Sequence, residues 1–441
     1  MSAMFSSLAV RNYRVWFAGA LVSNTGLWMQ RIAQDWLVLT ELTANDATAV
    51  GITTALNFGP QLLLLPITGY IADRFDRRLV LTLTQIAMGL LALGLGILTL
   101  TGVVELWMVY CFAGGLGIVS AIDAPVRQAF VSELVPPANL GNAVALNATA
   151  FNGARLVGPA IAGLLVAAVG SGWVFVINAG TYVAVLGALA LLRAAEMTRS
   201  AKAGSGAGAL GDGVRYVRKR PDIILVMTIV FLMGSFGLNF SIYVATMARI
   251  EFGQGAEVFG VLSSLLAIGS LTGSLLAARR ERPRLRTIVL ALLGFALAMT
   301  AGAFAPDVWV FGAVLTLAGM ATLTILTTAN AYVQTTTRPA MRGRVMALYL
   351  AIFLGGTPVG APVVGWIASA FGPRAAILVG AAAALLAALI AFAFYVRTRD
   401  LKLRWEPERR WPLRVRSGKT ARDRQLATTE IAIVEAESQR P

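Results

Sequence analysis

The sequence predicts an all-α membrane protein whose twelve transmembrane helices form two bundles of six. The chain of 441 residues is 57% hydrophobic and only 13% charged, roughly half the charged fraction of soluble domains. Its apolar residues fall into long runs, and its basic residues are concentrated in alternate breaks between them. A soluble protein of this size could not bury so much apolar surface, so the composition excludes an ordinary cytosolic enzyme.

Each predicted helix corresponds to one apolar run. A helix that crosses a bilayer needs about 20 predominantly apolar residues. The breaks between the runs carry Pro, Gly and charge, as loops do. The predicted spans are 16–40, 47–71, 79–101, 104–126, 140–168, 173–193, 222–249, 257–278, 286–305, 308–331, 343–370 and 374–396.

The distribution of basic residues predicts the topology. When residues at the ends of the spans are counted with the adjoining connections, 33 of the 37 Lys and Arg residues lie in the N-terminal segment, the even-numbered connections and the tail, whereas two lie at the odd-numbered connections and two inside the spans. Positive charge accumulates on the cytoplasmic side of membrane proteins. We therefore expect a multi-pass protein of the cytoplasmic (inner) membrane with both termini in the cytoplasm. The net charge of +15 is better explained by anionic lipid than by nucleic acid.

The longest connection divides the chain into two halves. It is rich in Gly and Ala and ends in a basic stretch, which is typical of a flexible linker followed by a surface helix. The expected organisation is an N-terminal bundle over 1–193, a cytoplasmic linker over 194–221, a C-terminal bundle over 222–397 and a basic cytoplasmic tail over 398–441.

The two halves repeat under an offset of 202 residues, which places Gly158, Gly163 and Gly170 on Gly360, Gly365 and Gly372. Repeated bundles of this kind imply a central path at their interface and rocking between inward-open and outward-open states.

The absent residue types restrict the chemistry. The chain has no histidine and a single cysteine, so histidine metal sites, imidazole bases and disulfides are excluded. Residues 417–420 read SGKT, but the glycine that a phosphate-binding loop requires upstream is a leucine, Leu413. We expect no metal, no nucleotide and no other cofactor, and proton chemistry must use carboxylates.

The second connection carries the most specific motif. Residues 69–78 read GYIADRFDRR, which resembles the loop signature G-x-L-A-D-R-x-G-R-K of the major facilitator superfamily. The resemblance implies the major facilitator fold. Asp76 stands where that signature has Gly, and it is expected to alter the turn because Asp tolerates a left-handed backbone less readily.

In that superfamily the loop belongs to a network that latches one conformation shut. By resemblance, the latch comprises Gly69, Asp73, Arg74, Arg77, Arg78 and Asp123. Asp73 is expected to interact with a helix N-terminus, and Arg77 to pair with Asp123 near the end of the fourth span. The alternative is that the three arginines only mark the cytoplasmic side.

The fifth span contains GARLVGPAIAG over residues 153–163. It resembles the Gly-Pro motif of exporters in this superfamily, and the first half of the chain is similar to the enterobactin-exporter branch and to macrolide-efflux and lysophospholipid-transporter relatives. The motif residues are Gly153, Gly158, Pro159 and Gly163. Their alternative role is close helix packing with a bend at the proline.

Away from the span ends, three ionisable residues lie inside predicted spans, where they are costly and therefore functional candidates. Arg31 and Asp35 are four residues apart, so they share a helix face and could form a permanent ion pair. Alternatively, Asp35 carries a proton that a cationic or hydrogen-bonding substrate displaces. Arg155 either attracts anionic substrate groups or ties helices together.

Other candidates for the cavity are polar or aromatic, namely Asn57, Gln61, Asn239 and Tyr243. Asn57, Gln61 and Asn239 could equally make an interhelical hydrogen bond, and Tyr243 could equally be an interfacial anchor. Trp28 could stack on substrate, although aromatic residues near span ends are more often interfacial anchors.

These features predict a secondary active transporter, not an enzyme. The favoured activity is proton-coupled efflux, by antiport, of amphipathic small molecules such as siderophores or drugs, which would connect it to siderophore export or drug resistance. The alternatives are a lipid or metabolite carrier without proton coupling and a non-transporting receptor or scaffold. The expected partners are small-molecule substrate, protons and lipid, with no nucleic acid, and the expected state is a monomer.

Overall fold

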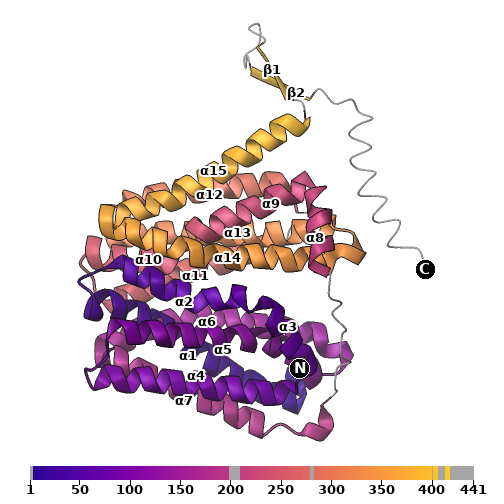
Figure 1. Cartoon of the computed structure of the whole chain (residues 1–441). Helices are drawn as coiled ribbons and strands as arrows, with labels where there is room; N and C mark the ends of the chain where they lie inside the picture. The colour runs from indigo at the N-terminus through magenta and orange to yellow at the C-terminus, as the bar shows by residue number, and fades with distance from the viewer. Residues whose placement is uncertain (1–2, 198–208, 279–282, 400, 406–412, 418–441) are drawn as a thin grey trace.

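The computed structural model describes residues 3–197, 209–278, 283–399, 401–405 and 413–417. Its helices form two halves that lie one above the other in Figure 1, the first coloured indigo to magenta and the second pink to yellow. Much of the predicted linker and most of the tail lie outside the described residues.

The first half contains seven α-helices. They are α1 (Arg11–Trp36), α2 (Ala47–Leu63), α3 (Leu65–Arg74), α4 (Arg77–Leu100), α5 (Leu106–Leu134), α6 (Leu140–Val169) and α7 (Ser171–Ala190). A short 3₁₀ helix, Ala3–Ala9, precedes α1, and a π-helical stretch, Leu37–Leu42, continues it. The predicted second span is divided into α2 and α3, because Pro66 lacks the amide hydrogen that would continue the helical ladder.

The second half begins with a broken helix. It comprises α9 (Pro221–Leu232) and α10 (Phe240–Thr246), each followed by a π-helical stretch, Met233–Gly237 and Met247–Glu251 respectively. The remaining helices are α11 (Ala256–Ala278), α12 (Leu285–Ala303), α13 (Val308–Thr336), α14 (Pro339–Phe371) and α15 (Pro373–Arg399).

Ten helical segments of the described residues are long and apolar enough to cross a membrane. They correspond to the third to twelfth predicted spans. The first span carries Arg31 and Asp35, and the second is divided. The helical membrane fold is confirmed, and the count of twelve stays a prediction.

In the described residues, a short helix and a pair of strands lie outside the bundles. Helix α8 (Ala209–Arg218) docks on α14, where Arg344 Nη1 lies 2.9 Å from Asp212 Oδ2. In the tail, strands β1 (Leu401–Trp405) and β2 (Leu413–Ser417) pair antiparallel, with Leu403 opposite Val415.

The internal repeat is visible in backbone geometry. Gly170 ends α6 with a φ of 85°, and Gly372 ends α14 with a φ of 90°. These two glycines correspond under the offset of 202 residues, and a positive φ of this size favours glycine. The equivalent helices of the two halves therefore end in the same way.

The halves meet through two symmetric helix pairs, α6 with α11 and α2 with α14. A Cβ atom added at Gly163 would lie 2.9 Å from the Cα of Gly260 on α11. In the other pair, a Cβ added at Gly365 would lie 3.0 Å from the carbonyl carbon of Ala47 on α2. Backbones approach this closely only where side chains are small.

Polar and aromatic contacts also join the two halves, at the end of the molecule where these glycines pack. The Ser369 hydroxyl at the end of α14 donates to Asp46 Oδ1 at the start of α2, at 2.7 Å. Trp36 stacks on Phe259, with ring centroids 5.8 Å apart. This end, hereafter the closed end, lies opposite the end that carries α8 and the N-terminus (Figure 1).

The Asp46 carboxylate is held by several donors at this end. Burial alone would raise its pKa, but hydrogen bonds from the side chains of Ser369 and Thr48 and from the amides of Thr48 and Ala49 outweigh it and hold the pKa below the usual value. The ionised form of Asp46 therefore bridges the two halves.

Candidate functional site

A cavity of about 860 Å³ lies between the halves on the α8 side of the closed end. Its walls come from α1, α2, α5 and α6 of the first half and from α10, α11 and α14 of the second. All five of its charged lining residues belong to the first half: Arg31, Asp35, Asp123, Arg127 and Arg155. The second half supplies apolar, hydroxyl and amide side chains, so the two walls differ in chemistry.

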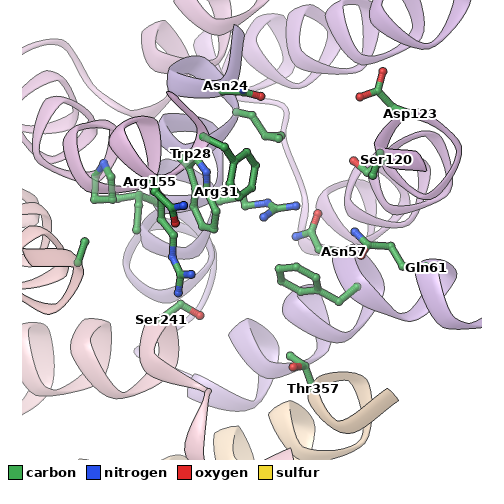
Figure 2. A pocket seen from close by; sticks show the side chains of 18 of the residues that line it. Asn24, Trp28, Arg31, Asn57, Gln61, Ser120, Asp123, Arg155, Ser241 and Thr357 are labelled. Atoms are coloured by element: carbon green, nitrogen blue, oxygen red, sulfur yellow. The ribbon is translucent and has the colours of Figure 1, made fainter. Parts of the chain in front are cut away.

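Trp28 on α1 lies beside two arginines. The Cζ atom of Arg31 is 5.0 Å from the centre of its ring, and the Cζ atom of Arg155 is 5.4 Å away. Arg31 also lies 4.7 Å from the centre of the Phe58 ring on α2. Figure 2 shows both arginines beside Trp28, with Arg31 directed toward Asn57 and Arg155 toward Ser241. The expectation that Trp28 is mainly an interfacial anchor is wrong, because it lines the cavity.

Asp35 lies one helical turn along α1 from Arg31, and its side chain is buried, at 6% exposure. No salt bridge of 4.0 Å or less joins the two in the described structure. The carboxylate instead interacts with Ser241 of the second half. The permanent Arg31–Asp35 ion pair is therefore not formed here, since Arg31 stacks on Trp28 and Phe58.

Three of the four polar candidates line the cavity: Asn57, Gln61 and Asn239. The expectation for Tyr243 is wrong. Its side chain is 0% exposed, and its hydroxyl donates to the carbonyl of Phe236. Tyr243 is a packing residue between α10 and α15.

Asp123 lies deeper along α5 than the predicted latch requires. Its carboxylate pairs with Arg127 Nε at 2.9 Å and accepts hydrogen bonds from Thr84 at 2.8 Å and Gln85 at 2.6 Å. The Arg127 guanidinium also lies over the Trp16 ring, at 5.5 Å. Asp123 and Arg127 therefore neutralise each other at the cavity wall.

The predicted partner of Arg77 is wrong. Arg77 Nη1 lies 2.8 Å from Glu133 Oε1, with both side chains mostly buried. Glu133 lies in the last turn of α5, which runs to Leu134, eight residues beyond the predicted span. Sequence reasoning missed Glu133 because the apolar run ends before the helix does. Glu133 is the acidic residue nearest the C-terminal end of α5, and this position could have indicated it.

The other latch residues have separate surroundings. Arg78 Nη2 donates to the carbonyl of Leu189 at 2.7 Å, which ties α4 to α7. Arg74 is exposed and lies over the Tyr70 ring at 5.7 Å. A Cβ atom at Gly69 would meet nothing within 4 Å. The side chain of Asp73 lies outside the described part of the structure.

Asp76 caps α4 and does not distort the turn. Its φ is −63°, and its carboxylate accepts a hydrogen bond from the amide of Leu79 at 3.0 Å. Because the backbone is extended here, no left-handed glycine is needed, and Asp is a favoured N-cap residue. The expectation of an altered turn is therefore wrong.

The Gly-Pro motif packs α6 against both halves. A Cβ atom at Gly158 would lie 2.8 Å from the Trp28 Cβ on α1, while Gly163 faces Gly260 on α11. Pro159 lines the cavity, and its carbonyl lies against Gly260. Gly153, by contrast, has open space around it. Three of the four motif residues thus lie where α6 meets α1 and α11.

The cavity between two repeated helical bundles agrees with the family to which comparison with known proteins assigns the chain. The family model described as "Transmembrane secretion effector" matches residues 2–433. The chain belongs to this family. It is a membrane transporter of the major facilitator superfamily, as the resemblance in the second connection implied.

Curated relatives of the transporter include exporters of siderophores and drugs. The "Staphyloferrin A transporter" of Staphylococcus aureus is 26% identical over 89% of this chain and 98% of its own length. The "Multidrug efflux pump Tap" of Mycolicibacterium fortuitum is 27% identical over 88% and 96%. The "Enterobactin exporter EntS" of Escherichia coli O1:K1 is 26% identical over 82% and 86%.

Solved structures show the same fold. A bacterial homologue of the human lysosomal transporter Spinster, in an inward-facing and unoccupied conformation, matches 87% of this chain and 97% of its own with a TM-score of 0.69. The sequence identity of 16% limits that likeness to the fold. In the cavity of this transporter, five charged residues of the first half face an uncharged wall from the second half.

Proposed function

We propose that this transporter exports amphipathic small molecules, siderophores or drugs, in exchange for protons and by alternating access. The observation that carries the proposal is the cavity of about 860 Å³ between the halves, closed at one end and containing the buried Asp35. The volume falls within the range that encloses drug-sized ligands.

The direction of access follows from the predicted topology. The positive-inside count assigns the end with α8 to the cytoplasm. The cavity lies on that side of the closed end, so in this conformation it would receive cargo from the cytoplasm. Opening the α6–α11 and α2–α14 contacts while closing the opposite end would present the same cavity outside.

Asp35 is the proposed proton carrier. Among the cavity residues that the structure describes, it is the carboxylate without a salt bridge, because Asp123 pairs with Arg127. It also interacts with Ser241, which belongs to the half that must move relative to α1. Protonation of Asp35 would therefore change a contact between the halves, and a cargo that hydrogen-bonds to it would compete with the proton.

Proteoliposomes with an imposed pH gradient test this proposal. We would measure uphill and downhill flux of a cationic dye and of a catecholate siderophore for wild type, Asp35→Asn and Asp307→Asn. The control, Asp307, is an exposed helix cap outside the cavity, and Asn caps helices equally well.

The proposal expects uphill flux in wild type and Asp307→Asn that a protonophore abolishes, while Asp35→Asn retains only downhill flux. Uphill flux through Asp35→Asn would remove the proton role from this residue. If no gradient-driven flux of either compound occurs in wild type, a carrier without proton coupling or a non-transporting receptor would replace the exporter.

A further inference from the structure

Arg31 and Arg155 are two cations of the cavity wall that form no salt bridge among the described residues. In the described structure no carboxylate lies within 4.0 Å of either guanidinium, and neither makes a hydrogen bond to the protein. The Nε atom of Arg31 is buried and unpaired. Burying an unpaired cation costs several kcal/mol, and an aromatic face returns about 0.5–2 kcal/mol.

The aromatic rings contact these cations without using their hydrogen-bond donors. The Cζ atom of Arg31 lies over the rings of Trp28 and Phe58, and the Cζ atom of Arg155 lies over the Trp28 ring. A guanidinium donates only in its own plane, in a fork that matches a carboxylate. Stacked arginines can therefore bind a planar anion without leaving the aromatic rings.

The charge balance of the cavity favours the same ligand. Asp123 and Arg127 form a pair at 2.9 Å, which leaves Arg31 and Arg155 against Asp35 alone. The two arginines are close enough to repel each other. An anion between them would relieve that repulsion, whereas a cation would add to it.

We infer that Arg31, Arg155 and Trp28 form a carboxylate-binding subsite, and that the cargo is an organic anion with an apolar body. The inference deepens the proposed function, because it rests on the cavity being the cargo site. The body of the molecule would lie along the apolar lining from Leu27, Phe151, Leu266 and Phe353. Asn57 and Gln61 would accept or donate hydrogen bonds beside the anionic group.

Binding to the purified transporter in nanodiscs tests the inference without any gradient. The probes are 2-naphthoate and 2-naphthamide, which share shape and differ in charge. Hydrogen bonds to charged groups predict that wild type binds the carboxylate at least about tenfold more tightly than the amide. Arg31→Gln and Arg155→Gln should each remove most of that preference and leave amide binding unchanged.

Two further variants control for charge and folding. Arg249→Gln removes one exposed positive charge outside the cavity and should keep the full carboxylate preference. Arg155→Lys keeps the charge but lacks the planar fork, so it should retain part of the carboxylate preference. This variant tests the inference if thermal unfolding shows that Arg155→Gln is poorly folded.

Equal binding of the two probes by wild type would overturn the inference, as would a carboxylate preference that survives in both glutamine variants. The proposed function fails separately. If wild type prefers the carboxylate but shows no gradient-driven flux in proteoliposomes, the anion subsite is supported and the exporter is refuted. If wild type shows uphill dye flux but binds the two probes equally, the exporter is supported and the anion subsite is refuted.

Discussion

Arg77 forms its ion pair with Glu133, at 2.8 Å, and not with Asp123. The pair joins the first turn of α4 to the last turn of α5, at the end of the molecule that carries α8. Asp123 lies three helical turns further into the bundle and serves the cavity wall through Arg127. The charges of the second connection and those of the cavity are therefore two separate networks.

Double-mutant cycles should separate these networks. Arg77→Gln and Glu133→Gln remove a mostly buried charged hydrogen bond, so we expect a coupling energy of about 1–2 kcal/mol between them. Arg77→Gln and Asp123→Asn should be additive within about 0.5 kcal/mol. Unfolding of the purified protein in detergent measures both cycles. Strong coupling of Arg77 to Asp123 would instead support the pairing inferred from sequence.

The sequence predicted the helices better than their contacts. Long apolar runs fix the membrane spans, and the offset of 202 residues correctly related Gly170 to Gly372, whose backbones are alike. The end of α5 was not predictable in this way, because a helix that continues past the bilayer into water loses its apolar signature. Glu133 was missed for that reason.

The directions of the side chains were the other feature that could not be predicted from the sequence. The π-helical stretch Met233–Gly237 inserts extra backbone into the seventh predicted span, so residues beyond it turn away from the face that regular helical spacing gives. Asn239 reaches the cavity, and Tyr243 one turn later does not. The paired stacking of Arg31 and Arg155 on Trp28 joins α1 to α6, and no local pattern predicts such a contact.

Tyr243→Phe should affect stability and not transport. The change removes the hydroxyl that donates to the Phe236 carbonyl, which predicts a loss of about 1 kcal/mol and a lower Tm. Since Tyr243 does not line the cavity, the KM for cargo should stay at the wild-type value. Asn57→Ala, at the cavity wall, should raise KM with a smaller effect on Tm. An altered KM in Tyr243→Phe would return this residue to the binding site.

Gly260→Ala should weaken the closed end. The added methyl would lie 3.0 Å from the Cα of Gly163 and against the carbonyl of Pro159. Backbone atoms cannot rotate away, so α6 and α11 must separate, at a cost of about 1–3 kcal/mol. We expect a lower Tm and a longer distance between spin labels on the neighbouring ends of these helices.

Gly153→Ala is the matched control for that experiment. Gly153 lies in the same helix, α6, and a Cβ atom there meets nothing within 4 Å. Its Tm and label distance should equal those of wild type. If the two alanine variants behave alike, the close approach of α6 and α11 does not hold this end shut.

Asp46 should stabilise the closed end in a pH-dependent way. Its hydrogen bonds lower the pKa below the usual 3.8, so the native state binds a proton more weakly than the unfolded chain does. The stabilisation is then fully present above that usual value and is lost as the pH falls through the lower native pKa.

Asp46→Ala removes the helix cap and the bridge to Ser369, which predicts a loss of about 1 kcal/mol at neutral pH. The difference in Tm between wild type and Asp46→Ala should stay constant between about pH 7 and pH 5 and shrink only below about pH 4. Ser369→Ala, which keeps the cap and removes the bridge, should show a smaller difference over the same range. A difference that instead widens as the pH falls from about 7 to about 4 would mean that the native pKa is raised, and the bridge between the halves would then depend on protonated Asp46.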